Sequence, residues 1–334
     1  LNIEGQIFID NTFFQNTNKN NKQTGNRLYE VEPNALMTNF KRIDFHIKMK
    51  NKVAEILPFP PLENLKIKNQ IRPSNKSCSS KNIKLVFTEN SYSNNVLISG
   101  EIPHSCKEYK LSRSVLSAED YFFYLFKYIW ESTDNGKFTP TYSLKKLPTD
   151  AIPLITWKSK KLGSVVKSTN KWSNNLMSKT LIYSLGYDPT TGQALPELGI
   201  KSIQNFLSAH NLSSNTLNII DGSGLNKDVR ASTEDMIRIL NFAWARNIMP
   251  EFVASLSIAG KDGTTRNLFK GMKLGNAVRI KTGTLNDVIS AGGYVFANSG
   301  NIYSLATIIN KPYLNKTNAR NALERIIKLI AETY

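Results

Sequence analysis

Cysteine and histidine are scarce in this chain of 334 residues, which contains two of the first and three of the second. Two cysteines are too few for a cysteine-rich zinc or iron–sulfur centre, which needs more sulfur ligands. The histidines are His46, His104 and His210, and none shares an expected helix face with another metal-ligating residue type. We therefore expect no metal site, and the sequence gives little support to a zinc protease or a Ser-His-Asp hydrolase.

Long hydrophobic runs are also lacking. The longest, Tyr121–Trp130, is interrupted by Lys127 and falls short of the ~18 residues that a membrane-spanning helix needs. The first residue is Leu1 rather than Met, and no charged-then-apolar leader precedes it. We therefore expect the chain to be part of a longer gene product.

Acidic residues are few: 26 Asp and Glu face 43 Lys and Arg, so the formal net charge is +17. The basic residues are spread out in short pairs such as Lys145-Lys146 and Lys160-Lys161, without a zinc spacing or an aromatic-plus-basic strand signature. Together with the abundance of Asn and Ile, this favours biased codon usage over a nucleic-acid-binding function. Such a surface would still be attracted to a polyanionic cell wall or membrane face.

Apolar residues make up 40% of the chain, which is enough for a sizeable core. Up to about residue 114 the sequence predicts mostly β structure, with alternating patterns in Ile3–Asp10 and Arg42–Lys50. A hairpin is expected from Ile83–Thr88 and Asn95–Glu101. The cysteines, Cys78 and Cys106, lie just outside this hairpin, which favours a disulfide over two free thiols because antiparallel partners bring their flanks together.

Composition changes near residue 115, where helical patterns begin. Ser117 is expected to cap a helix, and Ala151–Trp157 is a candidate strand. The remaining expected elements are helices at Ser173–Leu185, Ile200–Ala209, Ser232–Arg246 and Ala319–Thr333, and antiparallel strands at Val278–Lys281, Ile289–Phe296 and Ile302–Ile309. Residues 115–334 are therefore predicted to form an α+β domain.

Two short segments have residue types suited to chemistry. Lys281-Thr282-Gly283-Thr284 ends an apolar strand and offers an ammonium, hydroxyls and backbone N–H groups in one line, with a glycine that lets a substrate backbone approach. This suits a ligand with a carboxylate and a reacting carbonyl, although an ordinary solvated strand end is an equal alternative. Ser173-Asn174-Asn175 opens an expected helix, where a plain N-cap would also explain the serine. The similar Ser93-Asn94-Asn95 lies at a hairpin tip.

Between these segments lie DGSGL, at 221–225, and AGKDGT, at 259–264. In this order, the four segments resemble the class C low-molecular-mass penicillin-binding proteins, which are D-alanyl-D-alanine carboxypeptidases and endopeptidases. The resemblance covers residues 115–334 and implies a penicillin-binding (beta-lactamase/transpeptidase-like) α+β domain with an antiparallel sheet and helices. Residues 1–114 would be a mostly-β inserted accessory region.

The family's nucleophile lies in a Ser-x-x-Lys motif upstream of that insertion. The chain has three such spacings, at Ser143, Ser164 and Ser168, but all follow the insertion. We interpret them as coincidences of a Ser- and Lys-rich sequence. The nucleophile segment, with the first part of the catalytic domain, is then expected upstream of this chain.

The resemblance implies acyl transfer from a D-Ala-D-Ala peptide to that serine, followed by hydrolysis, without a metal or organic cofactor. Ser173 would relay a proton to the leaving amine, Asn175 would bind the substrate amide, and Lys281 would stabilise the developing charge. Substrate binding would fall to Thr282, Gly283 and Thr284, with the Thr284 N–H as half of the oxyanion hole.

The resemblance further implies an exported, periplasmic protein that binds peptidoglycan peptides and beta-lactam antibiotics, with no nucleic acid as partner. An exported protein would also suit a Cys78–Cys106 disulfide. Peripheral contact with the cell wall or a membrane surface is compatible with the charge. An inactive cell-wall-binding or scaffolding homologue remains the alternative, and a basic nucleic-acid-binding protein rests on the net charge alone.

Overall fold

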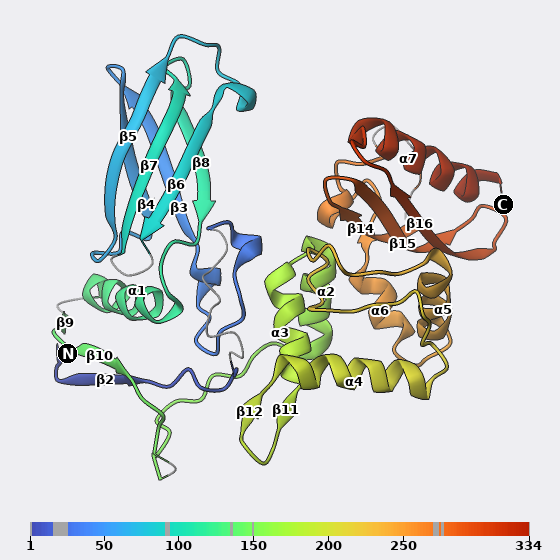
Figure 1. Ribbon diagram of the computed structural model, residues 1–334, viewed down its shortest axis with the longest axis horizontal. Coiled ribbons are helices and arrows are strands. Elements are labelled where there is room, and N and C mark those ends of the chain that lie inside the picture. The colour runs from blue at the N-terminus through green and yellow to red at the C-terminus, as the bar shows by residue number, and fades with distance from the viewer. Residues whose placement is uncertain are drawn as a thin grey trace. The chain divides into compact units, whose positions relative to one another are not determined.

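The chain is described by a computed structural model, which covers residues 2–15, 26–90, 94–133, 136–148, 150–269, 274 and 277–333. It divides into two compact units (Figure 1). Unit 1 comprises Leu1–Pro153 and Thr190–Gln193, and unit 2 comprises Leu154–Pro189 and Ala194–Tyr334. No helix among the described residues is long and apolar enough to cross a membrane.

Two three-stranded sheets make up most of unit 1. One has the order β4-β3-β8, and the other has the order β5-β7-β6. Their bounds are β3 Ile43–Lys50, β4 Val53–Phe59, β5 Lys66–Ser74, β6 Lys84–Asn90, β7 Asn95–Pro103 and β8 Glu108–Arg113. The alternating pattern of β3 turns Ile43 and Phe45 inward, where they share a core with Val96 and Ile98 of β7. The two sheets therefore pack face to face, as Figure 1 shows.

The expected hairpin and disulfide are both confirmed in unit 1. Strands β6 and β7 pair antiparallel, with Asn90 opposite Asn95. The Cys78 and Cys106 sulfurs are bonded, and Cys106 is buried in the core beside Ile102. Part of the turn between the strands, residues 91–93, lies outside the described residues.

Helix α1, Ala118–Ser132, belongs to unit 1 rather than to the second unit. Ser117 accepts a hydrogen bond from the Asp120 N–H, which confirms the predicted cap. The helix buries Tyr121 and Phe123 against unit 1. Composition predicted a boundary after residue 114, whereas the compact units separate at Pro153, because α1 packs on the preceding strands.

Unit 1 also contains four short strands among its described residues, which form two parallel pairs. These are β1 Asn2–Ile3 with β9 Lys137–Phe138, and β2 Gln6–Ile9 with β10 Thr141–Leu144.

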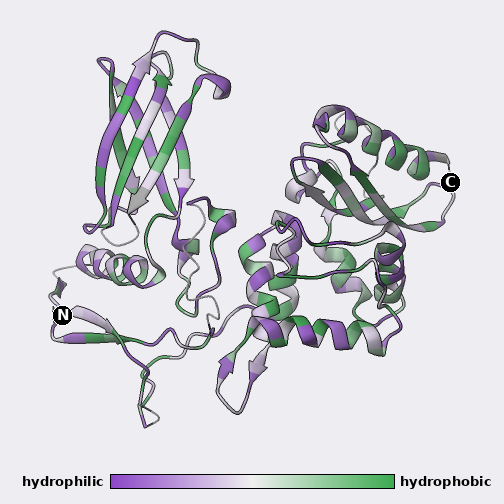
Figure 2. Cartoon of the chain, in the orientation of Figure 1, coloured by the Kyte–Doolittle hydropathy of each residue, from purple (hydrophilic) through white to green (hydrophobic). Residues whose placement is uncertain are grey.

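Unit 2 is built on a four-stranded antiparallel sheet with the order β13-β14-β15-β16. Its strands are β13 Ser257–Ile258, β14 Val278–Thr284, β15 Val288–Phe296 and β16 Ile302–Asn310. Helix α7, Lys316–Thr333, packs on Val278 and Ile280. In Figure 2 this helix carries both hydrophobic and hydrophilic residues along its length. On the other side, α5 (Thr233–Trp244) and α6 (Met249–Ser255) share a core with Tyr294. The three predicted strands and their antiparallel order are confirmed.

The remaining helices of unit 2 are α2 Leu162–Trp172, α3 Asn175–Leu185 and α4 Pro196–Ala209. A small hairpin pairs β11 Tyr187–Asp188 with β12 Gln193–Ala194. The predicted strand at Ala151–Trp157 is wrong: the segment is irregular and pairs with no strand among the described residues. Its large side chains are almost fully exposed, including Leu154 at 97% and Trp157 at 92%. The apolar pattern is typical of a strand, but neither a partner strand nor a core covers it in the part of the chain that the structure describes.

Candidate active site

The side chains of Ser173 and Lys281, 108 positions apart in the sequence, meet in unit 2. The Lys281 Nζ donates a hydrogen bond to the Ser173 Oγ at 2.7 Å and another to the Thr282 carbonyl at 2.6 Å. The fold therefore brings together two residues that the sequence analysis singled out in separate segments. When a serine hydroxyl is hydrogen-bonded to a lysine ammonium, a proton can pass between the two groups.

Strand β14 determines the direction of Lys281. Val278 and Ile280 point into the core beneath α7, so the alternation of the strand turns Lys281 to the opposite face. Lys281 also lies opposite Gly292, which is buried and where an added Cβ would lie 2.7 Å from the Met236 side chain. Burial lowers the pKa of Lys281 from 10.5 to about 8, because a desolvated ammonium is disfavoured. The lowered pKa brings Lys281 closer to the range in which a group can exchange a proton near neutral pH.

Ser173 occupies a sharp junction between two helices. Its φ of 52° and ψ of 48° place it in the left-handed region, where it ends α2. The prediction that Ser173 opens a helix is wrong by two residues: α3 begins at Asn175, and Asn174 is its N-cap. The Asn174 Oδ1 accepts from the Met177 N–H at 2.9 Å, so asparagine performs the capping expected of serine. The Ser173 hydroxyl is thereby available to Lys281.

The loop at 221–225 holds the first two turns of α3. The Asn175 Nδ2 donates to the Ser223 carbonyl at 2.8 Å, and the Ser178 Oγ donates to the Gly222 carbonyl at 2.7 Å. Gly222 has a φ of +69°, and a Cβ there would lie 2.2 Å from the Ile182 side chain. The loop therefore fixes the orientation of Asn175.

The rest of the KTGT segment lies along the same strand. Thr282 and Gly283 are partly buried, whereas Thr284 is exposed at the strand end. The Thr282 Oγ1 is 3.4 Å from the Thr264 Oγ1, which joins the segment to the AGKDGT turn. Hydroxyls, an ammonium and a strand edge are therefore close together, as a binding site for a peptide carboxylate requires.

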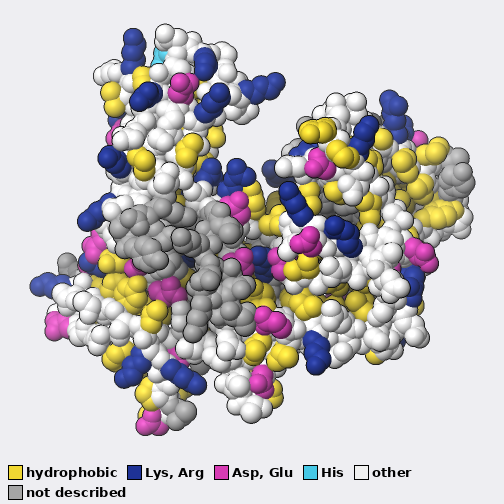
Figure 3. Space-filling view, in the orientation of Figure 1, with side chains coloured by type: hydrophobic (Ala, Val, Ile, Leu, Met, Phe, Trp, Pro, Cys, Tyr) yellow, Lys and Arg dark blue, Asp and Glu magenta, His cyan; other side chains and the backbone are white. Residues whose placement is uncertain are grey.

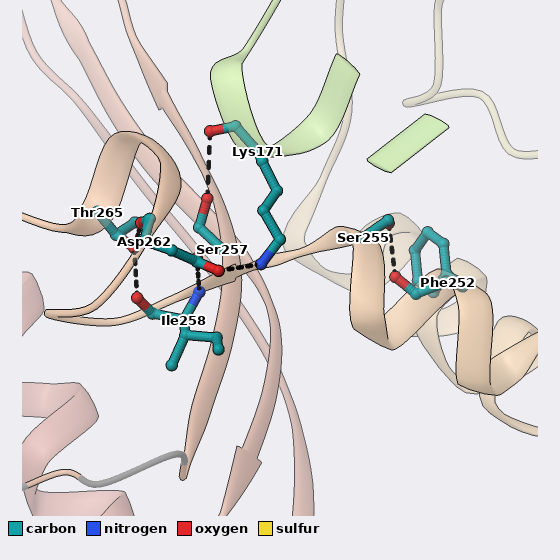
Figure 4. A network of polar contacts seen from close by, with 7 residues as sticks. All are labelled: Lys171, Phe252, Ser255, Ser257, Ile258, Asp262 and Thr265. Carbon is teal, nitrogen blue, oxygen red and sulfur yellow. Dashed lines mark hydrogen bonds and ion pairs between the residues drawn. The ribbon is translucent and has the colours of Figure 1, made fainter. Parts of the chain in front are cut away.

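Two charged residues near the site were not assigned by sequence reasoning. Lys171, two positions before Ser173, forms an ion pair with Asp262 of the AGKDGT turn (Figure 4). Burial alone would raise the pKa of the Asp262 carboxyl, but the hydrogen bonds from Lys171 and from the Ile258 N–H outweigh it and hold that pKa below its usual value. Asp262 belongs to the AGKDGT segment, but its separation of 91 positions from Lys171 hid the pairing.

None of the three serines with a Ser-x-x-Lys spacing forms a described hydrogen bond with Ser173 or Lys281. Ser143 is on β10 of unit 1 and accepts from the Gln6 Nε2 at 3.3 Å. Ser164 and Ser168 lie on α2, and the lysine that follows Ser168 at this spacing is Lys171, which is bound to Asp262. None of the three is joined to Lys281 by a described contact. Among the described residues there is also no cluster of His, Cys, Asp and Glu that could hold a metal.

Comparison with known proteins identifies the family. The sequence profile of the D-Ala-D-Ala carboxypeptidase 3 (S13) family matches residues 1–333. The chain belongs to this family. The D-alanyl-D-alanine carboxypeptidase of an Actinomadura species is 28% identical over 151 residues, which are 44% of this chain and 28% of that protein. Penicillin-sensitive carboxypeptidase A of Dictyostelium discoideum is 22% identical over 184 residues, 52% of this chain and 35% of that protein. The matched region spans about a third of each of these curated relatives.

Solved structures confirm the predicted fold. Penicillin binding protein 4 (dacB) from Haemophilus influenzae superimposes with a TM-score of 0.80 at 20% identity, covering 98% of this chain and 74% of that chain. Its complex with a novel beta-lactam superimposes with a TM-score of 0.72 at 20% identity, covering 89% and 69%. The chain therefore has the α+β architecture of a penicillin-binding protein of this type.

Proposed function

We propose that this chain carries the proton-relay and substrate-binding part of a serine D-Ala-D-Ala carboxypeptidase or endopeptidase that acts on peptidoglycan stem peptides. The observation that carries the proposal is the hydrogen bond between the Lys281 ammonium and the Ser173 hydroxyl. Membership of the S13 family supports the choice of substrate. The lowered pKa of Lys281 supports a role in proton transfer.

In this proposal each site residue has one role. Ser173 relays a proton to the leaving amine, with Lys281 as its partner and as a source of positive potential for the developing oxyanion. Asn175 hydrogen-bonds the substrate amide. Thr282 and Thr284 hold the terminal carboxylate along the strand, Gly283 leaves space for the peptide, and the Thr284 N–H is half of the oxyanion hole.

We further propose that the acylated serine lies upstream of residues 1–334. The positions of Ser143, Ser164 and Ser168 support this, since none contacts Lys281 in the described structure. The serine would attack the peptide carbonyl, expel the terminal D-alanine and be released by water. No metal or organic cofactor is needed for these steps.

We also propose that the protein is exported to the periplasm. The Cys78–Cys106 disulfide supports an oxidising compartment. On the face drawn in Figure 3, Lys and Arg side chains are spread over both units, which suits diffuse attraction to an anionic cell-wall or membrane surface rather than a nucleic-acid groove. Beta-lactams are proposed as ligands, as in the structure of the Haemophilus influenzae protein.

Labelling by a fluorescent penicillin tests the proposal. We expect the 334-residue chain to remain unlabelled and the longer natural protein to be labelled, because an acyl-enzyme requires the activated serine. In the longer protein, Lys281→Ala should slow acylation by roughly 10²–10³-fold. Ser173→Ala should slow it by roughly 10²–10⁴-fold through lost proton transfer.

Exposed residues of α4 provide matched controls: Lys201→Ala and Ser208→Ala should label at the wild-type rate. Labelling of the 334-residue chain would instead make one of Ser143, Ser164 and Ser168 the nucleophile. A longer protein that binds peptidoglycan but is not labelled would favour the scaffolding alternative.

A further inference from the structure

The last turn of α2 is fastened to the segment 255–265 by side chains and backbone together (Figure 4). The Lys171 Nζ pairs with the Asp262 Oδ2, and the Lys171 carbonyl accepts from the Ser257 Oγ at 3.4 Å. One position earlier, the Asn170 Nδ2 donates to the Ser255 Oγ at 2.8 Å. Lys171 is only 9% exposed, so its ammonium depends on this carboxylate for charge compensation.

The same segment is attached to the strand that carries Lys281. The second oxygen of Asp262 accepts from the Ile258 N–H at 2.7 Å, which closes the turn. Ile258 pairs with Arg279 of β14, and the preceding residue of β13 pairs with Ile280, next to Lys281. Asp262 thus connects, with its two oxygens, the helix before Ser173 and the sheet that holds Lys281.

Gly263 gives independent evidence that this junction is tightly packed. It has a φ of +55°, and a Cβ there would lie 2.5 Å from the Lys171 carbonyl oxygen and 2.3 Å from the Ser257 Oγ. Backbone and hydroxyl therefore fill the space that a side chain would need. This close packing fixes the distance between the C-terminal end of α2 and the turn that contains Gly263.

We infer that Lys171 and Asp262 are positioning residues that set the spacing between Ser173 and Lys281. Ser173 follows Lys171 by two residues and stands in the left-handed region at the end of α2, so its hydroxyl moves with that end. Neither charged residue contacts the Ser173–Lys281 pair in the described structure. The inference rests on the proposed function for its catalytic meaning, but the spacing itself is measurable without catalysis.

The first test follows the titration of Lys281 in the 334-residue chain by NMR of ¹³Cε/¹⁵Nζ-labelled lysine, with the signal assigned by its loss in Lys281→Met. Lys171→Met and Asp262→Asn should both raise the midpoint from about 8 towards 10.5. The reason is that a displaced Ser173 leaves the Lys281 ammonium open to water, which removes the desolvation that lowers its pKa.

The two variants separate positioning from charge. A through-space effect would move the midpoint in opposite directions, because Lys171→Met removes a positive charge and Asp262→Asn removes a negative one. Shifts of opposite sign, or an unchanged midpoint in folded variants, overturn the inference. Two shifts in the same upward direction support it.

Matched variants guard against loss of folding. Lys171→Arg keeps the charge and reach and should keep the midpoint within a few tenths of the wild-type value. Glu332→Gln breaks the 3.7 Å ion pair with Lys328 on α7 and should leave the midpoint unchanged. If Asp262→Asn does not fold, Gly263→Ala tests the same junction through its backbone, and an unchanged midpoint there contradicts the inference.

The second test uses the longer natural protein and fluorescent penicillin. Lys171→Met and Asp262→Asn should slow acylation by roughly 10–100-fold, the scale on which small misplacements act, and Lys171→Arg should restore most of the rate. An unlabelled wild-type protein would contradict the proposed function alone, since the titration of Lys281 needs no acylation. A labelled protein whose two variants react at the wild-type rate contradicts the positioning role.

Discussion

Lys281 is largely buried and donates two hydrogen bonds. Its ammonium donates to Ser173 and to the Thr282 carbonyl, and burial lowers its pKa from 10.5 to about 8. In the unfolded chain the same lysine keeps its ordinary pKa, so between these two values the unfolded state binds more protons than the folded one. At neutral pH the buried ammonium therefore lowers the free energy of unfolding. This destabilisation is relieved as the pH rises from about 8 to 10.5.

We expect Lys281→Met to increase the free energy of unfolding at pH 7 by roughly 2 kcal/mol, since each unit of pKa shift corresponds to about 1.4 kcal/mol and part of the gain is lost with the hydrogen bonds. This gain should shrink as the pH rises from about 8 to 10.5, because wild-type Lys281 then loses its proton in the folded state while the unfolded state still holds it, and it should be gone above 10.5. Urea unfolding of both proteins at several pH values measures it. A difference that does not vary with pH would contradict the assigned environment of Lys281.

At this scale the sequence predicted part of the site. Lys281 and Ser173 were singled out because one ends an expected strand and the other opens an expected helix, and because their segments, with two others in order, resemble the motifs of a known family. The Lys171–Asp262 ion pair was not predicted, because the burial of Lys171 and its pairing across 91 positions are properties of the tertiary fold. From the sequence alone a lysine is expected to be exposed to solvent, because charged residues are seldom buried without a partner.

At the scale of single elements, helix α5 shows how a local signal is strengthened by distant residues. Ser232 and Asp235 form a capping box at the start of this helix. Asp235 is also fully buried and accepts from the Ser214 Oγ at 2.5 Å and the Thr216 Oγ1 at 2.6 Å. Burial alone would raise the pKa of Asp235, but these hydrogen bonds with those from Ser232 outweigh it and hold the pKa well below 3.8.

The depressed pKa of Asp235 gives the sign of an acid effect. Its stabilisation is complete above the ordinary pKa of 3.8 and is lost as the pH falls through the lower folded-state value. Asp235→Asn should therefore lower the free energy of unfolding at pH 7 by roughly 1–3 kcal/mol and flatten the loss of stability in acid. Glu234→Gln, at the exposed neighbouring position, is the control and should change neither. Equal acid sensitivity of Asp235→Asn and wild type would exclude this role.

The start of α3 shows where pattern recognition loses precision. Ser173, Asn174 and Asn175 are all good capping residues, so composition cannot choose among them. The structure chooses Asn174, because the left-handed backbone of Ser173 ends α2 and turns its hydroxyl to Lys281. The existence of this helix could be predicted from the sequence, whereas the two-residue shift that frees the serine could not.

At the scale of the whole molecule, the two units have separate cores. Ile43, Phe45 and Ile98 are buried in unit 1, and Val278, Ile280 and Ile327 in unit 2. The change in composition near residue 115 marked the start of helix-rich sequence, but α1 contributes Tyr121 to the core of unit 1. A boundary is decided by which core a helix covers, and composition does not contain that information.

Separate cores predict two unfolding transitions, one of which depends on the disulfide. Cys78 and Cys106 close a loop of sequence separation 28 in unit 1, so replacing both with serine should cost that unit roughly 3–4 kcal/mol on the loop-entropy estimate. Scanning calorimetry should then show the transition of unit 1 at a lower temperature and that of unit 2 unchanged. The Lys281 midpoint, measured by NMR in the same variant, should also stay at about 8, because the Ser173–Lys281 pair lies within unit 2. A shift of both transitions together would show that the units unfold as one, and would contradict the independence of their cores.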